Sequence, residues 1–169
     1  MNGHPGGEEH TRRMLALSGL QNGARILDMG AGAGEAVALL RSLDYDAVGI
    51  DLEPRSALVQ KGDMLHTGFA SGSFDAVVSQ CAFYISGDVP GALREAKRLL
   101  RPGGTLMLSD VFVEDPAEQI EQAGFTLVCQ EDMTALWRAY YLEALWRGEA
   151  DGCVGRGKCG YWLLICTKE

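Results

Sequence analysis

The sequence predicts an α/β fold with a doubly wound, Rossmann-like and mostly parallel sheet of seven strands. Three observations favour this class. Short apolar runs alternate with segments of helical periodicity from residue 25 onward. A glycine-rich turn at residues 30–34 joins the first of these runs to the helical segment that follows it. The final apolar run, residues 161–167, is continuous, as expected of a strand buried on both faces.

The length and the charge of the chain limit its class and its partners. At 169 residues it suits one domain with a buried core. A formal net charge of −8 argues against duplex nucleic acid and anionic membranes as partners. No apolar run reaches the roughly 18 residues that span a bilayer, and residues 1–9 are too polar for a signal peptide. Because the five cysteines are scattered, we expect reduced thiols and a cytoplasmic protein.

The single domain divides into three expected parts: a cap helix within residues 1–23, a ligand-binding core at residues 24–112, and a C-terminal, substrate-side half at residues 113–169. The expected helices span residues 8–19, 35–43, 89–100, 116–123 and about fifteen residues from Met133. The expected strands span residues 25–29, 47–51, 57–60, 76–79, 105–109, 125–130 and 161–167. Residues 101–104, which read RPGG, are expected to end the helix before them.

The second crossover of the sheet departs from the usual pattern. Only residues 52–56 separate the second expected strand from the third. A parallel crossover normally takes a dozen or more residues and a helix, and Pro54 disfavours helical geometry at the residue before it. We therefore expect this crossover helix to be missing or reduced to one turn.

The glycine-rich turn carries the main functional signal. Residues 28–34 read DMGAGAG, so an acidic residue precedes three glycines that stand at every second position. A dinucleotide fingerprint needs its third glycine one residue later, where this chain has Glu35, whose carboxylate would repel a pyrophosphate. Asp28 suits a positively charged ligand instead. The pattern resembles motif I of the class I S-adenosylmethionine-dependent methyltransferases.

Two further segments extend this resemblance over residues 25–112. Residues 69–79 read FASGSFDAVVS and resemble a segment of the small-molecule methyltransferases of the type 11 kind, which include the ubiquinone and menaquinone C-methylating enzymes. Residues 100–106 read LRPGGTL and resemble the crossover of the same family. An Asn-Pro-Pro-Tyr segment, typical of amino-methylating nucleic-acid enzymes, is missing after residue 79. The resemblance implies an antiparallel last strand and a small-molecule acceptor, with no nucleic-acid or membrane partner; the oligomeric state stays open.

The resemblance also implies a cofactor, S-adenosylmethionine, with S-adenosylhomocysteine as the product. The glycine turn would shape the methionine end, which Asp28 supports. Asp51 would accept the ribose hydroxyls, Asp63 would accept the adenine amino group, and Met64 would cover the ring. The expected cofactor-binding residues are Asp28, Gly30, Ala31, Gly32, Gly34, Asp51, Leu52, Asp63, Met64 and Gln80.

The acceptor side is less defined. Methyl transfer requires a general base only when the acceptor is protonated, and no residue is assigned as catalytic. The candidates for the substrate pocket are His4, His10, Cys81, Tyr84 and Asp110. The alternative for both histidines is a solvated surface position. No metal is expected, because Cys153 and Cys159 miss the spacing of zinc ligands.

The expected function is methyl transfer from S-adenosylmethionine to a small-molecule acceptor. One alternative is a protein that binds S-adenosylmethionine without catalysis. Another is a thiol-dependent metalloid methyltransferase, because residues 78–81, VSQC, are similar to the cysteine-bearing segment of arsenite methyltransferases; however, no cysteine precedes Cys81. A nicotinamide-dependent oxidoreductase is disfavoured by the spacing of the glycines.

Overall fold

A computed structural model gives the fold and describes residues 4–148 and 159–169. The helices are α1 (Gly7–Ser18), α2 (Glu35–Ser42), α3 (Val89–Leu99), α4 (Ala117–Gln122) and α5 (Thr134–Trp146). The strands are β1 (Arg25–Met29), β2 (Asp46–Asp51), β3 (Val59–Lys61), β4 (Phe74–Gln80), β5 (Leu100–Phe112), β6 (Phe125–Asp132) and β7 (Gly160–Lys168). Cys153 lies outside the described residues.

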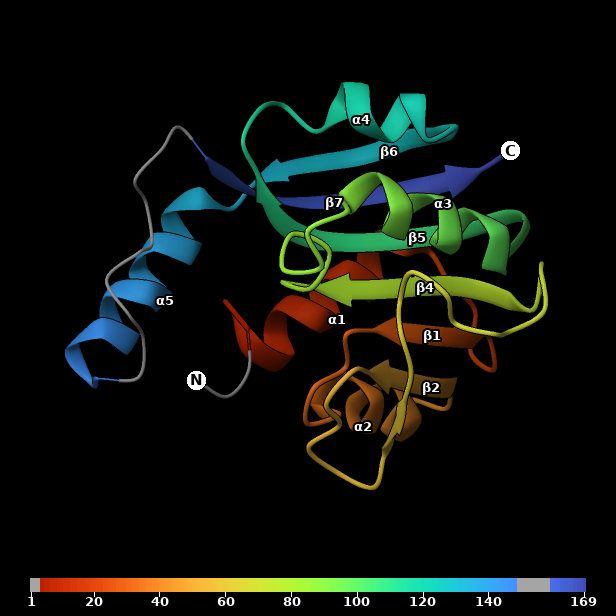
Figure 1. Cartoon of the computed structure of the whole chain (residues 1–169), viewed down its shortest axis with the longest axis horizontal. Helices are drawn as coiled ribbons and strands as arrows, with labels where there is room; N and C mark the ends of the chain where they lie inside the picture. The colour runs from red at the N-terminus through yellow and green to blue at the C-terminus, as the bar shows by residue number, and fades with distance from the viewer. Residues whose placement is uncertain (1–3, 149–158) are drawn as a thin grey trace.

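The strands of the described chain form one seven-stranded sheet in the order β3-β2-β1-β4-β5-β7-β6 (Figure 1). The pairs from β3 to β5 are parallel, and β7 runs antiparallel to both β5 and β6. The predicted fold class, including the antiparallel last strand, is confirmed. The order reverses between β1 and β4, and ligands of such sheets bind at this reversal, beyond the carboxyl ends of the strands.

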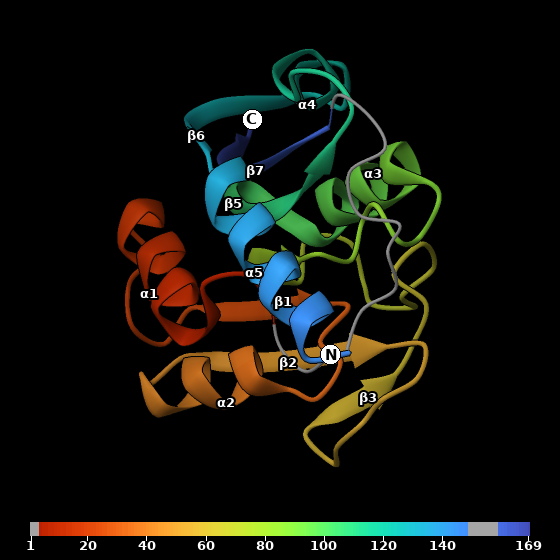
Figure 2. The ribbon, with the colours of Figure 1, turned by 90° about the vertical axis from the view of Figure 1, so that its left-hand side faces the viewer.

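Helices cover both faces of the sheet, as Figure 2 shows. On one face α1 and α2 pack through Met14, Leu15, Val37 and Leu40. On the other face α3 and α4 contribute a second cluster of buried side chains, which includes Leu93, Leu99 and Ile120. Helix α5 covers neither face; it extends past the carboxyl ends of the strands, on the side where the chain begins (Figure 1). No helix in the described ranges combines the length and the apolar character needed to cross a membrane.

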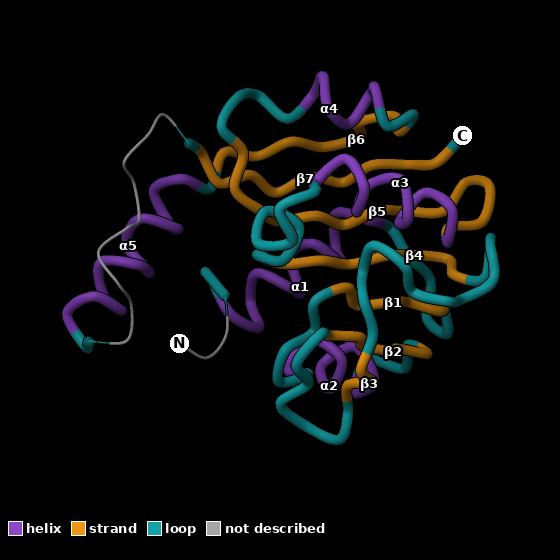
Figure 3. The backbone as a smooth tube through the Cα atoms, viewed as in Figure 1, coloured by secondary structure: helices purple, strands orange, loops and turns teal. Residues whose placement is uncertain are grey.

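The crossover from β2 to β3 is a loop, as predicted (Figure 3). The third strand itself is shorter and begins two residues later than expected, at Val59, because only residues 59–61 pair with β2. The helix before residues 101–104 ends at Leu99, as predicted, but the next strand begins earlier than residue 105. Strand β5 starts at Leu100, which pairs with Phe74, and the extra residues are absorbed as a bulge before Thr105 pairs with Ala76.

Helix α5 is amphipathic in sequence but only partly buried in space. Of the residues expected on its apolar face, Trp137 and Ala144 are buried. Leu136, a third member of that face, keeps 38% of its surface exposed. The helix therefore contributes one edge to the core and leaves the rest of its surface over the ligand end of the sheet.

Candidate active site

A cavity of about 470 Å³ lies at the ends of β1, β2 and β4, closed on one side by the start of the chain and by α5. Its size is typical of a site for a small ligand or cofactor. The cavity brings together most of the residues that the sequence singled out: His4, Asp28, Gly30, Ala31, Gly32, Asp51, Leu52, Asp63, Met64, Gln80 and Cys81. Four others, Gly34, His10, Tyr84 and Asp110, do not line it.

The glycine turn forms one wall and cannot accept larger residues. Gly30, Gly32 and Gly34 have φ values of 88°, 51° and 83°, in the left-handed region that favours glycine. A Cβ at Gly30 would collide with the Cβ of Ala82. The amides of Gly30 and Ala31 both donate to the carbonyl of Ile50, each at 2.9 Å, so the turn is held against the end of β2. Gly34 ends the turn as the residue before α2.

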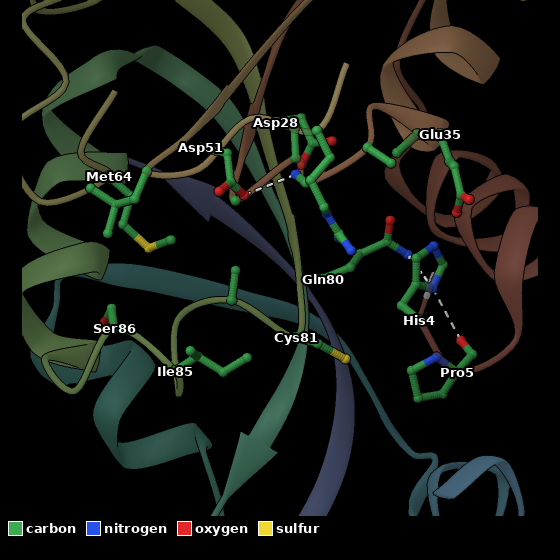
Figure 4. A pocket seen from close by; sticks show the side chains of 18 of the residues that line it. His4, Pro5, Asp28, Glu35, Asp51, Met64, Gln80, Cys81, Ile85 and Ser86 are labelled. Carbon is green, nitrogen blue, oxygen red and sulfur yellow. Dashed lines mark hydrogen bonds between the residues drawn. The ribbon is translucent and has the colours of Figure 1, made fainter. Parts of the chain in front are cut away.

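Asp51 is fixed by the backbone around it. Its Oδ2 accepts the amide of Gly32 at 2.8 Å, and its Oδ1 accepts the amide of Glu53 at 2.9 Å. Each oxygen keeps further lone pairs for a ligand. The carboxylate therefore stands pre-oriented at the cavity, beside the glycine turn (Figure 4).

Asp28 is the most deeply buried acid of the cavity wall, with 3% of its surface exposed. Burial and the nearby charge of Asp51 raise the pKa of Asp28 to about 7. Two carboxylates held this close disfavour each other's ionisation. A positive charge in the cavity would relieve that repulsion, whereas a phosphate would worsen it.

The far end of the cavity carries Asp63 and Met64. The Oδ1 of Asp63 accepts the amide of Leu65 at 2.8 Å, which fixes the loop after β3. Met64 projects its thioether toward the cavity from the same loop (Figure 4). Leu52, next to Asp51, completes this end and is 59% exposed. This end offers an acceptor and a soft apolar cover to a flat heterocycle.

The start of the chain is joined to β4 by three side chains. Nε2 of Gln80 lies 3.3 Å from Nδ1 of His4, and Nε2 of His4 lies 3.4 Å from the hydroxyl of Thr11. That hydroxyl donates in turn to Oε1 of Gln80 at 3.2 Å. Burial lowers the pKa of His4, so its imidazole is neutral at pH 7. Gln80 lies between Asp51 and His4 in Figure 4, so this ring of contacts separates two parts of the cavity.

His10 lies behind the cavity, not in it. Only 3% of its surface is exposed, and its Nε2 lies 2.7 Å from the hydroxyl of Ser109. Burial lowers its pKa to about 4. The neutral imidazole is thus part of the packing between α1 and β5.

Cys81 does line the cavity, in a left-handed backbone conformation with φ of 57°. Its thiol lies 3.2 Å from the hydroxyl of Tyr161, and burial raises its pKa to about 12. The thiol is therefore protonated at neutral pH, which makes it a poor metal ligand or nucleophile. No group of three or more metal-ligating side chains occurs in the described ranges.

Asp110, in β5, supports the loop after β4 through hydrogen bonds to its backbone. Its carboxylate accepts the amides of Phe83, Tyr84 and Val111 at 2.8, 3.2 and 2.7 Å. Burial nevertheless raises its pKa to about 6. Tyr84 itself turns outward and is 51% exposed. Asp110 thus acts on the cavity through the backbone that it holds.

Several lining residues escaped the sequence reasoning. In the sequence, Glu35 argues only against a pyrophosphate ligand, and no motif singles out Arg55 or Ile85. Tyr140 and Tyr141 reach the cavity from α5. A helical face of aromatic residues indicates packing, but it does not say which of two adjacent tyrosines faces a ligand.

Comparison with known proteins agrees with this geometry. Residues 27–108 match the model of the family described as "Methyltransferase domain". An arsenite methyltransferase of Aquipseudomonas alcaligenes is 30% identical over 125 residues, covering 59% of this chain and 36% of the relative. A demethylmenaquinone methyltransferase of Beutenbergia cavernae is 33% identical over 110 residues, covering 59% of this chain and 45% of the relative. The chain thus spans less than half the length of either relative.

Solved structures show the same fold at lower identity. The [4+2]-cyclase SpnF superposes with a TM-score of 0.75 at 21% identity, covering 95% of this chain and 80% of its own. A putative sarcosine dimethylglycine methyltransferase from Galdieria sulphuraria superposes with a TM-score of 0.74 at 18% identity. The match covers 95% of this chain and 84% of the methyltransferase chain. One of these two is named a cyclase, so the fold alone does not give the reaction. The match of residues 27–108 to the methyltransferase domain family agrees with the class that the glycine motif indicated.

Proposed function

We propose that this protein transfers the methyl group of S-adenosylmethionine to a small-molecule acceptor. The observation that carries the proposal is the pair of carboxylates, Asp28 and Asp51, at one glycine turn of a cavity of about 470 Å³. Burial, and then the nearby charge of Asp51, raises the pKa of Asp28, so a positive charge beside it would favour its ionised form. S-adenosylmethionine carries a sulfonium and an ammonium group, so its charge suits such a site, and the family match favours the same cofactor.

The residues present fit this cofactor part by part. Asp51 would hold the ribose hydroxyls, while Asp63 and Met64 would receive the adenine. The turn at Gly30–Gly32 would hold the methionine part, near Asp28. When bound, S-adenosylmethionine supplies an electrophilic methyl group next to a positively charged sulfur.

The chain's own contribution is enclosure and orientation. His4 and Gln80 close one side of the cavity, and α5 brings Tyr140 and Tyr141 over it. Holding two reactants in line and excluding water supplies a large share of the rate in such reactions. Both nitrogens of the neutral His4 imidazole are in contact with Gln80 or Thr11, so His4 contributes to the wall of the cavity.

Calorimetry followed by a turnover assay tests the proposal. We expect the protein to bind S-adenosylmethionine and S-adenosylhomocysteine but not NADH. We then expect S-adenosylhomocysteine to form when S-adenosylmethionine is supplied with a panel of small amines, phenols and thiols. Binding of NADH alone would overturn the proposal. Binding of S-adenosylmethionine without turnover on any acceptor would favour the second candidate, a non-catalytic binding protein.

The metalloid alternative is less well supported. It requires a thiolate at Cys81, whereas the thiol there is buried and protonated. Arsenite-dependent turnover that disappears in Cys81→Ser would revive it. We expect neither arsenite binding nor arsenite-dependent turnover.

A further inference from the structure

We propose that the acceptor end of this cavity binds an organic ammonium group, so that the methyl acceptor is a small amine. The ammonium ion loses a proton to solvent water before its nitrogen lone pair takes the methyl group and S-adenosylhomocysteine leaves. This inference rests on the proposed function and names its substrate class. Three features carry it: the charge of the lining, the aromatic rings that α5 brings to it, and their common position at one end of the cavity.

The lining is dominated by negative charge. Four carboxylates, those of Asp28, Glu35, Asp51 and Asp63, line the cavity together with one guanidinium, that of Arg55. His4 adds no charge at pH 7, because burial lowers its pKa. S-adenosylmethionine brings one net positive charge, which leaves the lining negative. An anionic acceptor would be repelled, whereas a cationic one would be attracted.

Aromatic rings form the wall from α5. Tyr140 and Tyr141 line the cavity, with ring centroids 5.7 Å apart and an angle of 86° between their planes. Trp137 braces Tyr141 edge-on at 5.4 Å and lies parallel to Tyr161 at 6.4 Å. Rings fixed at right angles present both a face and an edge, and the face attracts an ammonium ion within about 6 Å of its centroid.

One of the carboxylates and these rings lie at the same end of the cavity. Glu35 lies close enough to His4 for its negative charge to raise the pKa of His4. Burial lowers that pKa by more, so the net shift is downward. Figure 4 places Glu35, His4 and Pro5 together, away from Asp51 and Met64. A Cβ at Gly6, the residue after Pro5, would lie 3.2 Å from Leu136 of α5, so α5 packs against this end. Glu35 thus remains available at the acceptor end once Asp51 and Asp63 hold the nucleoside.

The test uses three probes of equal shape on protein saturated with S-adenosylhomocysteine. Choline carries a quaternary ammonium, 3,3-dimethylbutan-1-ol is its neutral carbon counterpart, and 3,3-dimethylbutanoate is an anion of similar size. We expect choline to bind at least about tenfold more tightly than the alcohol, and the carboxylate not to bind. Equal affinity for choline and the alcohol, or preference for the carboxylate, would overturn the inference.

Variants locate the binding energy. Tyr141→Leu should weaken choline binding about tenfold with little effect on the alcohol, while Tyr141→Phe, which keeps the ring, should retain the preference. Glu35→Gln should also lower the preference for the cation. Matched controls are Trp146→Leu, on the same helix and 90% exposed, and Glu53→Gln, an exposed acid outside the cavity lining. Both controls should behave as the wild type, and an equal loss in a control would contradict the assigned position.

The outcomes separate this inference from the proposed function. If S-adenosylhomocysteine fails to bind the wild-type protein, the proposed function fails. If it binds and choline gains nothing over the alcohol, the amine assignment fails and the methyltransferase assignment stands.

Discussion

The two ends of the cavity are built in different ways. At the nucleoside end, Asp51 is held by the amides of Gly32 and Glu53, all within one βαβ segment of the chain. At the acceptor end, the contacts join residues far apart in sequence, such as His4 with Gln80 and Cys81 with Tyr161. Neighbouring elements of the chain, β1 to β3 with their loops, thus form the cofactor end. The acceptor end depends instead on how the N-terminal residues, β7 and α5 pack together. The cofactor end can therefore keep its structure while changes at the acceptor end alter which acceptor binds.

The sharpest way to break this contrast is Asp51→Ala. The substitution leaves two amides without their acceptor and removes the proposed partner of the ribose. Because hydrogen bonds to a charged group are worth about 1.5–3 kcal/mol each, we expect the dissociation constant for S-adenosylhomocysteine to rise about 100-fold. Calorimetry measures it directly.

Glu53→Ala is the matched control, since its exposed side chain lies beside the same loop. Its dissociation constant should stay within about twofold of the wild type. A rise of less than about fivefold in Asp51→Ala would mean that the cofactor does not use this carboxylate.

The same contrast explains what the sequence could predict. The sequence predicts β1 and β2 from local apolar runs that reach Asp28 and Asp51. This works because a strand, its turn and the next helix form from neighbouring residues. The bulge at Leu100–Thr105 could not be foreseen, because pairing with Phe74 and Ala76 decides it. His10 and Asp110 were expected near substrate, yet both turn into the core, where Ser109 and three backbone amides pair with them. The direction of such side chains is set by tertiary packing rather than by spacing.

Asp110→Ala should damage the acceptor end and spare the cofactor end. Without this carboxylate the amides of Phe83, Tyr84 and Val111 lose their acceptor, and the loop that carries Cys81 loosens. We expect the free energy of unfolding to fall by about 2 kcal/mol, measured by urea denaturation.

Affinity for S-adenosylhomocysteine should change by less than about threefold in Asp110→Ala, because Asp51 and the glycine turn keep their own supports. Asp115→Ala serves as the control, since that exposed acid accepts only the amide of Ala117 and the side-chain amide of Gln130, away from the cavity, and its loss should leave the urea midpoint nearly unchanged. A loss of cofactor affinity as large as that of Asp51→Ala would show that the two ends are not separable.

The smallest expected effect is a pH dependence that belongs to the cofactor end alone. Burial and the charge of Asp51 hold the pKa of Asp28 at about 7, so about half of the free protein carries a proton there at pH 7. A cationic ligand favours the ionised form, so its binding lowers this pKa and releases a proton. Affinity for S-adenosylmethionine should therefore fall about tenfold from pH 8 to pH 6. Asp28→Asn should flatten the profile, and proton release should vanish when titrations in buffers of different ionisation enthalpy are compared. A wild-type profile that matches Asp28→Asn would mean that Asp28 does not face the positive charge, and the cofactor end would then recognise the nucleoside alone.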